Sequence, residues 1–167
     1  MTKKRTTKPK DVRATLADHI DSAITACRMR GAQMTPLRVA VLSALWSADR
    51  PLGAYEMRDL VSKSIGRKIA AASVYRALDF LCAQGAAARI ESRNAYVACK
   101  HPSHEHACVF LVCESCGDAK EIENPKVEQL IDADAKRLGF TVKHRVVELS
   151  GFCAPCQKGA ALTAHGA

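Results

Sequence analysis

The chain has 167 residues, with 25 Lys or Arg against 17 Asp or Glu and a formal net charge of +8. This length allows two small domains, each able to bury a core. No apolar run approaches the roughly 18 residues of a membrane span, and the basic N-terminus lacks the apolar segment of a signal peptide. The sequence therefore indicates a cytoplasmic protein that does not enter a membrane, whose cysteines serve as metal ligands or core residues rather than disulfides.

Charge and metal-ligating residue types divide the chain into two parts. Residues 1–95 carry 17 Lys or Arg against 8 Asp or Glu, whereas residues 96–167 carry 8 against 9. Five of the six His and six of the eight Cys follow residue 95. The first part is thus expected to bind a polyanion, and the second to bind metal.

The chain begins with a basic tail, residues 1–10, which is too poor in apolar residues to pack and is expected to be disordered. Residues 11–30 then repeat apolar residues at helical spacing. This pattern places Cys27 in a core rather than in a metal site, and Gly31 is expected to end the helix.

A second helix is expected to begin with Thr35 as N-cap and Pro36 as first helical residue. Arg38 would point outward near its start. The residues expected on its buried face are Leu37, Ala40, Val41, Ala44 and Leu45.

Residues 51–53 (Pro-Leu-Gly) read as a turn, and residues 54–64 as a third helix. The apolar residues expected to face the core here are Leu60, Val61 and Ile65.

The next helix is expected over residues 70–85, with Ser73 as N-cap and Gly85 as the stop. Its core side is predicted to comprise Val74, Ala77, Leu78, Leu81 and Cys82. Tyr75 and Arg76 would then face solvent in the first turns. A helix that offers Arg outward can read the DNA major groove, where Arg takes guanine O6 and N7 together, although a solvated polar face is the ordinary alternative.

Two short strands follow, residues 87–91 and 95–99, joined by residues 92–94 as a hairpin. Helices followed by a hairpin are typical of a winged helix. Together with the concentration of positive charge, this order favours DNA binding.

The second part is expected to be a small α/β unit. It would contain strands over 108–113, 119–123 and 140–149 and a helix over 125–138 ended by Gly139. Exposed strand edges and a modest core favour pairing with a second copy. The fold class is therefore α+β, with these limits: tail 1–10, winged-helix domain 11–95, hinge 96–99, dimerisation and metal-binding domain 100–157, C-terminal tail 158–167.

Two C-x-x-C pairs, 113–116 and 153–156, have the spacing with which two thiolates meet one ion. Together they predict a closed, structural zinc site of four cysteines, namely Cys113, Cys116, Cys153 and Cys156. A site with four sulfur ligands has no open coordination position, which argues against catalysis there.

A second group of metal-ligating residue types lies where the two parts meet and comprises Cys99, His101, His104, Glu105, His106 and Cys108, with Glu121 just past the first C-x-x-C pair. Such a mixture can make a site with sulfur, nitrogen and oxygen ligands. At this position a metal could set the angle between the two domains and so convert metal concentration into DNA affinity. A solvated His-rich loop is the alternative.

Seven collinear segments resemble the ferric-uptake-regulator superfamily, and most closely its zinc-uptake-regulator branch. They are MTPLR, GAYEM, SVYRALDFL, ESRNAYVAC, CESCG, KHRVVELSGFC and the closing C-x-x-C, within residues 15–156. The resemblance implies a cytoplasmic bacterial homodimer that binds a palindromic operator when loaded with Zn²⁺. Members mostly repress zinc-uptake genes, and some activate export genes, where RNA polymerase would be a further partner.

By position, the resemblance implies that Tyr55 and Arg76 read bases, with Tyr75, Arg38 and Ser73 also at the DNA. It assigns the structural zinc to Cys113, Cys116, Cys153 and Cys156. Three regulatory ligands follow in the same way: Cys99, His106 and Glu121. Two Zn²⁺ per chain are therefore expected, one structural and one regulatory.

The sequence departs from the family pattern at Ala88, where related sensors place a fourth ligand, a His. We expect His104 to replace it, because a residue two positions from His106 can reach the same ion. His101, Glu91 or water are the alternatives.

A thiolate at Cys99 suits Zn²⁺ better than the nitrogen and oxygen ligands expected for an iron or peroxide regulator, which is the alternative within the superfamily. A zinc hydrolase or deaminase is a more distant alternative. The deaminase pair of H-x-E and P-C-x-x-C is absent from the sequence, and residues 104–106 (His-Glu-His) are not the protease motif H-E-x-x-H. The chain is therefore not expected to be an enzyme.

Overall fold

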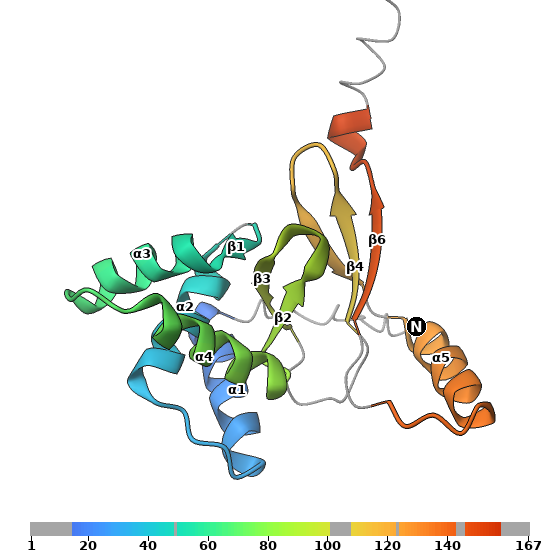
Figure 1. The fold of residues 1–167 in the computed structure, drawn as a ribbon, viewed down its shortest axis with the longest axis horizontal. Coiled ribbons are helices and arrows are strands. Elements are labelled where there is room, and N and C mark those ends of the chain that lie inside the picture. The colour runs from blue at the N-terminus through green and yellow to red at the C-terminus, as the bar shows by residue number, and fades with distance from the viewer. Residues whose placement is uncertain (1–14, 49, 101–107, 123, 143–145, 158–167) are drawn as a thin grey trace, which may run out of the picture.

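The computed structural model describes residues 15–48, 50–100, 108–122, 124–142 and 146–157. Their elements follow one another along the chain as a helical part, a hairpin and a second sheet with one helix (Figure 1). In order they are α1 (Leu16–Met29), α2 (Pro36–Ser47), β1 (Leu52–Gly53), α3 (Ala54–Ile65), α4 (Ala71–Ala83), β2 (Ala87–Ile90), the 3-10 turn η1 (Glu91–Arg93), β3 (Ala95–Ala98), β4 (Cys108–Cys113), β5 (Ala119–Ile122), α5 (Pro125–Arg137) and β6 (Val146–Gly151).

The first two helices begin at well-capped residues. Thr15 and Asp18 form a reciprocal capping box at the start of α1. At α2 the Thr35 hydroxyl accepts the Arg38 amide, and Pro36 is the first helical residue, as the sequence predicts. Within the described residues, a side-chain oxygen therefore satisfies one free amide at each of these two helix starts.

Helix α4 lies within the predicted range, but Ser73 is not its N-cap. The cap is Ala70, whose carbonyl accepts the amides of Ser73 and Val74. Alanines at 71 and 72 favour helix, so the first turn extends over them and leaves Ser73 inside it. The C-terminal prediction is confirmed: Gly85 has φ +65°, a left-handed conformation that favours glycine.

The helices enclose one apolar core. Val41, Leu42, Val61, Val74, Leu78 and Leu81 have no exposed surface, and Cys27 is equally buried, as predicted. Leu60 was expected inside but is 42% exposed, whereas Met57, one turn earlier on α3, is fully buried. The predicted turn at 51–53 is in part a strand, because β1 pairs with β3.

The hairpin forms as predicted and links the helical core to the second sheet. Strands are ordered β1-β3-β2 in the first sheet and β5-β4-β6 in the second, with β4 antiparallel to β5 and parallel to β6. Ala88 and Ile90 of β2 pack against Phe110 and Val112 of β4 in a second buried cluster. The hairpin accordingly lies between the helices and the second sheet (Figure 1).

The predicted limits of the last strand are wrong. The last strand is Val146–Gly151 rather than 140–149, and Phe140 to Val142 have no regular structure. The predicted hinge, 96–99, is occupied by β3 and by Cys99, whose amide donates to the Ala86 carbonyl. The domain limits themselves remain a prediction.

Helix α5 forms as predicted and Gly139 follows it with φ +67°, yet the described part of the chain does not bury its apolar side. None of its residues is buried, and Leu130 is 68% exposed. The helices of the described part include none long and apolar enough to cross a bilayer.

Candidate nucleic-acid interface and metal centres

The outer side of α4 presents the residues that the sequence singles out for DNA. Arg76 is exposed, and its guanidinium donates to the Ser73 hydroxyl at 3.3 Å. Val74 and Leu78 anchor the opposite side of the helix in the core. Tyr75 is half-buried against that core. Of these two side chains, Arg76 is therefore the more accessible to DNA.

Tyr55 lies at the start of α3 and is 66% exposed. Its neighbour Ala54 is buried, which fixes the first turn of the helix. The Arg58 guanidinium carbon lies 5.6 Å from the centre of the Tyr55 ring, a cation–π contact that leaves the phenol outward.

Arg38 does not project outward as predicted. Its guanidinium carbon lies 3.4 Å from the centre of the Phe80 ring on α4, and its Nη1 donates to the Gln33 carbonyl at 2.5 Å. The side chain therefore connects the start of α2 to α4 by a cation–π contact, and Arg38 as a whole is half-buried.

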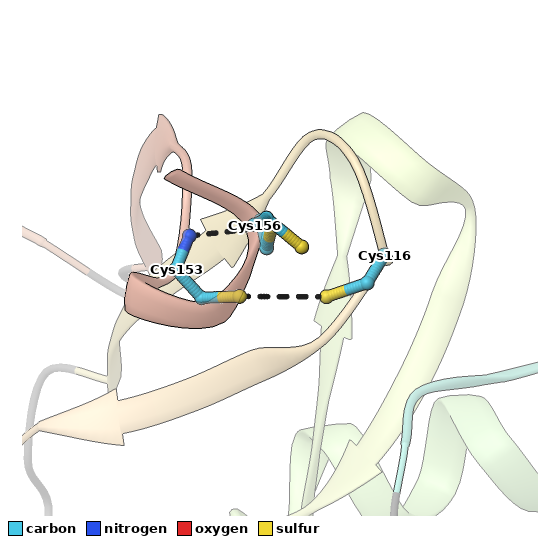
Figure 2. Close-up of side chains that lie close together, drawn as sticks. Cys116, Cys153 and Cys156 are labelled. Atoms are coloured by element: carbon cyan, nitrogen blue, oxygen red, sulfur yellow. Dashed lines mark hydrogen bonds between the residues drawn. The ribbon is translucent and has the colours of Figure 1, made fainter. Parts of the chain in front are cut away.

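The structure brings Cys113, Cys116, Cys153 and Cys156 together. Their four sulfur atoms all lie within 4.8 Å of one another, and the sulfurs of Cys116 and Cys153 are 3.7 Å apart (Figure 2). Zn–S bonds of about 2.3 Å in a tetrahedron place sulfurs about 3.8 Å apart. The donor set and its spacing therefore fit Zn²⁺, and a disulfide, at about 2.05 Å, is excluded for this pair.

The sheet positions these cysteines. Strand β4 ends at Cys113, which pairs with Gly151 at the end of the parallel strand β6. The Glu114 amide donates to the Gly151 carbonyl at 2.8 Å, and Gly117 completes the knuckle with φ +76°. Two stretches about 40 residues apart thus present their C-x-x-C pairs at the same edge.

Backbone amides already favour a thiolate in this cluster. The amide of Cys116, followed by that of Cys153, lowers the pKa of Cys113 from 9.0 to about 6. The Cys153 amide lies 3.4 Å from the Cys113 sulfur. Because thiolates are the form that binds zinc, this arrangement suits a metal site.

Of the predicted regulatory ligands, the structure brings two together. Cys99 is 1% exposed, and its sulfur lies 3.8 Å from the Glu121 Oε1 on β5. The other two, His104 and His106, lie outside the described residues, as does His101. Ala88, for which we expect His104 to substitute as ligand, is buried in the hairpin.

Sequence reasoning missed the contacts between the hairpin tip and the second sheet. The Glu148 carboxylate accepts the amides of Glu91 and Ser92, and Arg93 donates to the carbonyls of Cys113 and Glu114. These pairs are separated by 20 to 57 positions, so no local pattern marks them.

Residues 29–150 match the Ferric uptake regulator family. The chain belongs to the ferric uptake regulator family. Membership places it among regulators rather than enzymes.

Within the family, the chain is similar to the Zinc uptake regulation protein of Escherichia coli K12, with 34% identity over 86% of this chain and 84% of that protein. Its fold is similar to a solved structure titled Zinc Uptake Regulator Complexed With Zinc AND DNA, with TM-score 0.78 and 33% identity over 89% of this chain and 99% of that one. Another similar structure is holo XcZur, with TM-score 0.74 and 39% identity over 86% of this chain and 99% of that one.

Proposed function

We propose that this chain is a zinc-responsive transcription regulator that binds a palindromic operator as a zinc-loaded homodimer and represses zinc-uptake genes. The observation that carries the proposal is the pairing, in one chain, of a basic helical domain presenting Arg76 with a second domain whose four cysteines fit one zinc. The similarity to a regulator solved with zinc and DNA supports it. Activation of export genes, with RNA polymerase as partner, would be a further role.

The DNA would be read by the exposed residues of α3 and α4. Tyr55 and Arg76 are the proposed base readers, since both are exposed and a guanidinium can take guanine in the major groove. Tyr75, Arg38 and Ser73 would lie near the DNA backbone. The net charge of +9 on residues 1–95, from 17 basic and 8 acidic side chains, would supply salt-dependent attraction to phosphate.

Two zinc ions per chain are proposed. The structural one would be held by Cys113, Cys116, Cys153 and Cys156, where the ion would cross-link the segments that follow β4 and β6. The regulatory one would be held by Cys99, His104, His106 and Glu121. The contact between the Cys99 thiol and the Glu121 carboxylate supports a mixed site. An iron or peroxide regulator is the alternative, and the thiol ligand favours zinc over it.

A second copy of the chain would cover the apolar surface of the second domain. The exposed large apolar residues of this domain are Leu111, Leu130, Leu138, Phe140, Leu149 and Phe152. Leu111 and Leu149 are paired on β4 and β6, on the sheet side away from the hairpin. Several large apolar residues exposed on one domain are typical of a homodimer interface.

The test is Cys99→Ser measured beside the wild type for operator binding as free zinc is varied. We expect the substituted protein to fold and dimerise but to need much more zinc for the same DNA affinity, because an alcohol is a poor zinc ligand. Cys82→Ser is a matched control, since Cys82 lies in α4 and is not among the proposed zinc ligands. Unchanged zinc dependence in Cys99→Ser would exclude the proposed regulatory site.

A further inference from the structure

The tip of the hairpin is fastened to the second sheet at two points. At the first, the Glu148 carboxylate on β6 accepts the backbone amides of Glu91 and Ser92, the latter at 3.2 Å. These amides open the 3-10 turn at the tip, so the carboxylate caps that turn. Hydrogen bonds to a charged acceptor are stronger than those between neutral groups.

At the second point, the Arg93 guanidinium reaches the four-cysteine cluster itself. Its Nη2 donates to the carbonyl of Cys113 at 2.7 Å and to that of Glu114 at 2.8 Å. Cys113 contributes its sulfur to the cluster and its carbonyl to Arg93. A residue of the hairpin therefore contacts the backbone of a residue whose sulfur is a proposed zinc ligand.

Between these points and Cys99, the body of the hairpin is packed on the same side of the sheet. Ile90 of the hairpin and Phe110 of β4 are buried in the same apolar cluster. Phe110 lies opposite Glu148 in the pairing of β4 with β6. Phe110 also pairs with Glu121, the residue that contacts Cys99. One side of the sheet thus carries the apolar contact, the tip contacts and the proposed regulatory pair.

The hairpin is also continuous with the helix that presents Arg76. The Ala86 amide donates to the Leu81 carbonyl at the end of α4, and Ala86 and Ala87 belong to the helical core. A displacement of the hairpin would carry α4 with it, because packed cores move as units. A dimer reads two half-sites only when its two recognition helices are held at a fixed spacing.

We propose that Arg93 and Glu148 are positioning residues that couple the four-cysteine cluster to the DNA-reading helix. In this account the cluster stabilises the second domain and also fixes the hairpin, and through it α4. The inference rests on the proposed function for its effect on DNA. Coupling is reciprocal, so operator DNA should in turn protect the cluster.

The main competing explanation is that Arg93, as a residue of the hairpin tip, contacts phosphate directly. Glu148 separates the two explanations, because removing a carboxylate near DNA would strengthen binding by relieving repulsion. If the carboxylate holds the tip, its removal weakens binding instead. The sign of the Glu148→Ala effect therefore distinguishes positioning from direct contact.

The first experiment uses the full-length, zinc-loaded protein without DNA and compares Arg93→Ala and Glu148→Ala with the wild type. Amide hydrogen exchange should accelerate at Glu91 and Ser92 and stay unchanged in the helical core at Val74 and Leu78. The second measurement is the rate at which a chelator removes zinc from the four cysteines, which Arg93→Ala should increase. Both readouts are independent of operator binding, so they test the contacts even if the proposed function fails.

The second experiment measures operator affinity over a range of salt concentrations. Both variants should bind about tenfold more weakly, with the wild-type salt dependence retained. Arg89→Ala and Glu114→Ala are matched controls that should have small effects. Arg89 pairs with Glu91 and Asn94 inside the hairpin, and Glu114 offers Arg93 only its backbone carbonyl, which alanine retains.

Three results would overturn the proposal. The first is unchanged amide exchange at Glu91 and Ser92 in Glu148→Ala. The second is operator binding by Glu148→Ala that equals or exceeds that of the wild type. The third is a salt slope lowered by about one in Arg93→Ala, which would make Arg93 a phosphate ligand.

Discussion

The helical part and the sheet part of this chain bury their apolar residues in different ways. Val41, Leu42, Leu78 and Leu81 of the helical part are fully buried within one chain. In the sheet part, Leu130, Leu138 and Phe140 are 68–72% exposed. The first part carries its own core, whereas in our proposal the second part depends on a zinc held by four cysteines and on contact with a second copy of the chain.

The largest expected effect is the unfolding of the sheet part in Cys113→Ser. Zinc held by four thiolates contributes on the order of 10 kcal/mol to small folds, and an alcohol cannot replace a thiolate ligand. We expect loss of the tightly held zinc and of dimerisation, with the helical part still folded. Metal analysis, sedimentation and circular dichroism would check this. Retention of a full-strength dimer would mean that the cluster is not a structural site.

A cavity in the helical part should destabilise that part and leave the sheet part unchanged. Leu78→Ala removes a fully buried side chain of α4 and should lower the unfolding free energy by about 2–5 kcal/mol. Zinc content and dimerisation should persist, because the sheet part does not share this core. Thermal unfolding monitored separately at the two parts should show a lower unfolding temperature in the helical part alone. An equal decrease in both parts would show that they fold as one unit.

Arg76→Ala should leave both parts folded and remove operator preference. A bidentate Arg–guanine contact contributes about 1–3 kcal/mol of discrimination between bases. Competition between operator and unrelated DNA would measure this loss, with dimer mass and zinc content unchanged. Arg137→Ala on α5 is a matched control, since Arg137 is exposed, pairs with Asp134 and lies in the sheet part. A loss of zinc in Arg76→Ala would show that Arg76 supports the metal site rather than reading DNA.

The smallest expected effect is a local response of α1 to acid. Hydrogen bonds from the backbone and side chain of Thr15 hold the pKa of Asp18 below its ordinary value of 3.8. Because the folded pKa is lowered, this contribution is complete above pH 3.8 and is lost as the pH falls through the folded value. Titration of the Thr15 amide by NMR would check it, and a midpoint at or above 3.8 would contradict the assignment.

Local patterns predicted the helical part well. Thr35 and Pro36 start α2, Gly85 follows α4, and the residues expected on the inner side of α4 are buried except for half-buried Cys82. The errors arise where local signals compete. Ser73 is a good cap, but the two alanines before it extend the helix, and Arg38 is drawn onto Phe80 by a contact between helices.

The cysteine cluster was predictable because C-x-x-C pairs carry a chemical signal at any separation, and the sheet then brings them to one edge. The contacts of Glu148 and Arg93 were not predictable, because each depends on a docking of the hairpin that no short stretch encodes. A carboxylate in a strand and an arginine in a turn are ordinary surface residues until the fold is known.

The most direct test of a zinc-responsive regulator is metal content per chain, before and after mild chelation, with binding to a zinc-uptake promoter followed in the same samples. We expect two zincs per chain, one resistant to the chelator and one labile, with DNA affinity following the labile one. One tight zinc together with DNA binding that ignores chelation would contradict it and leave a constitutive DNA-binding dimer.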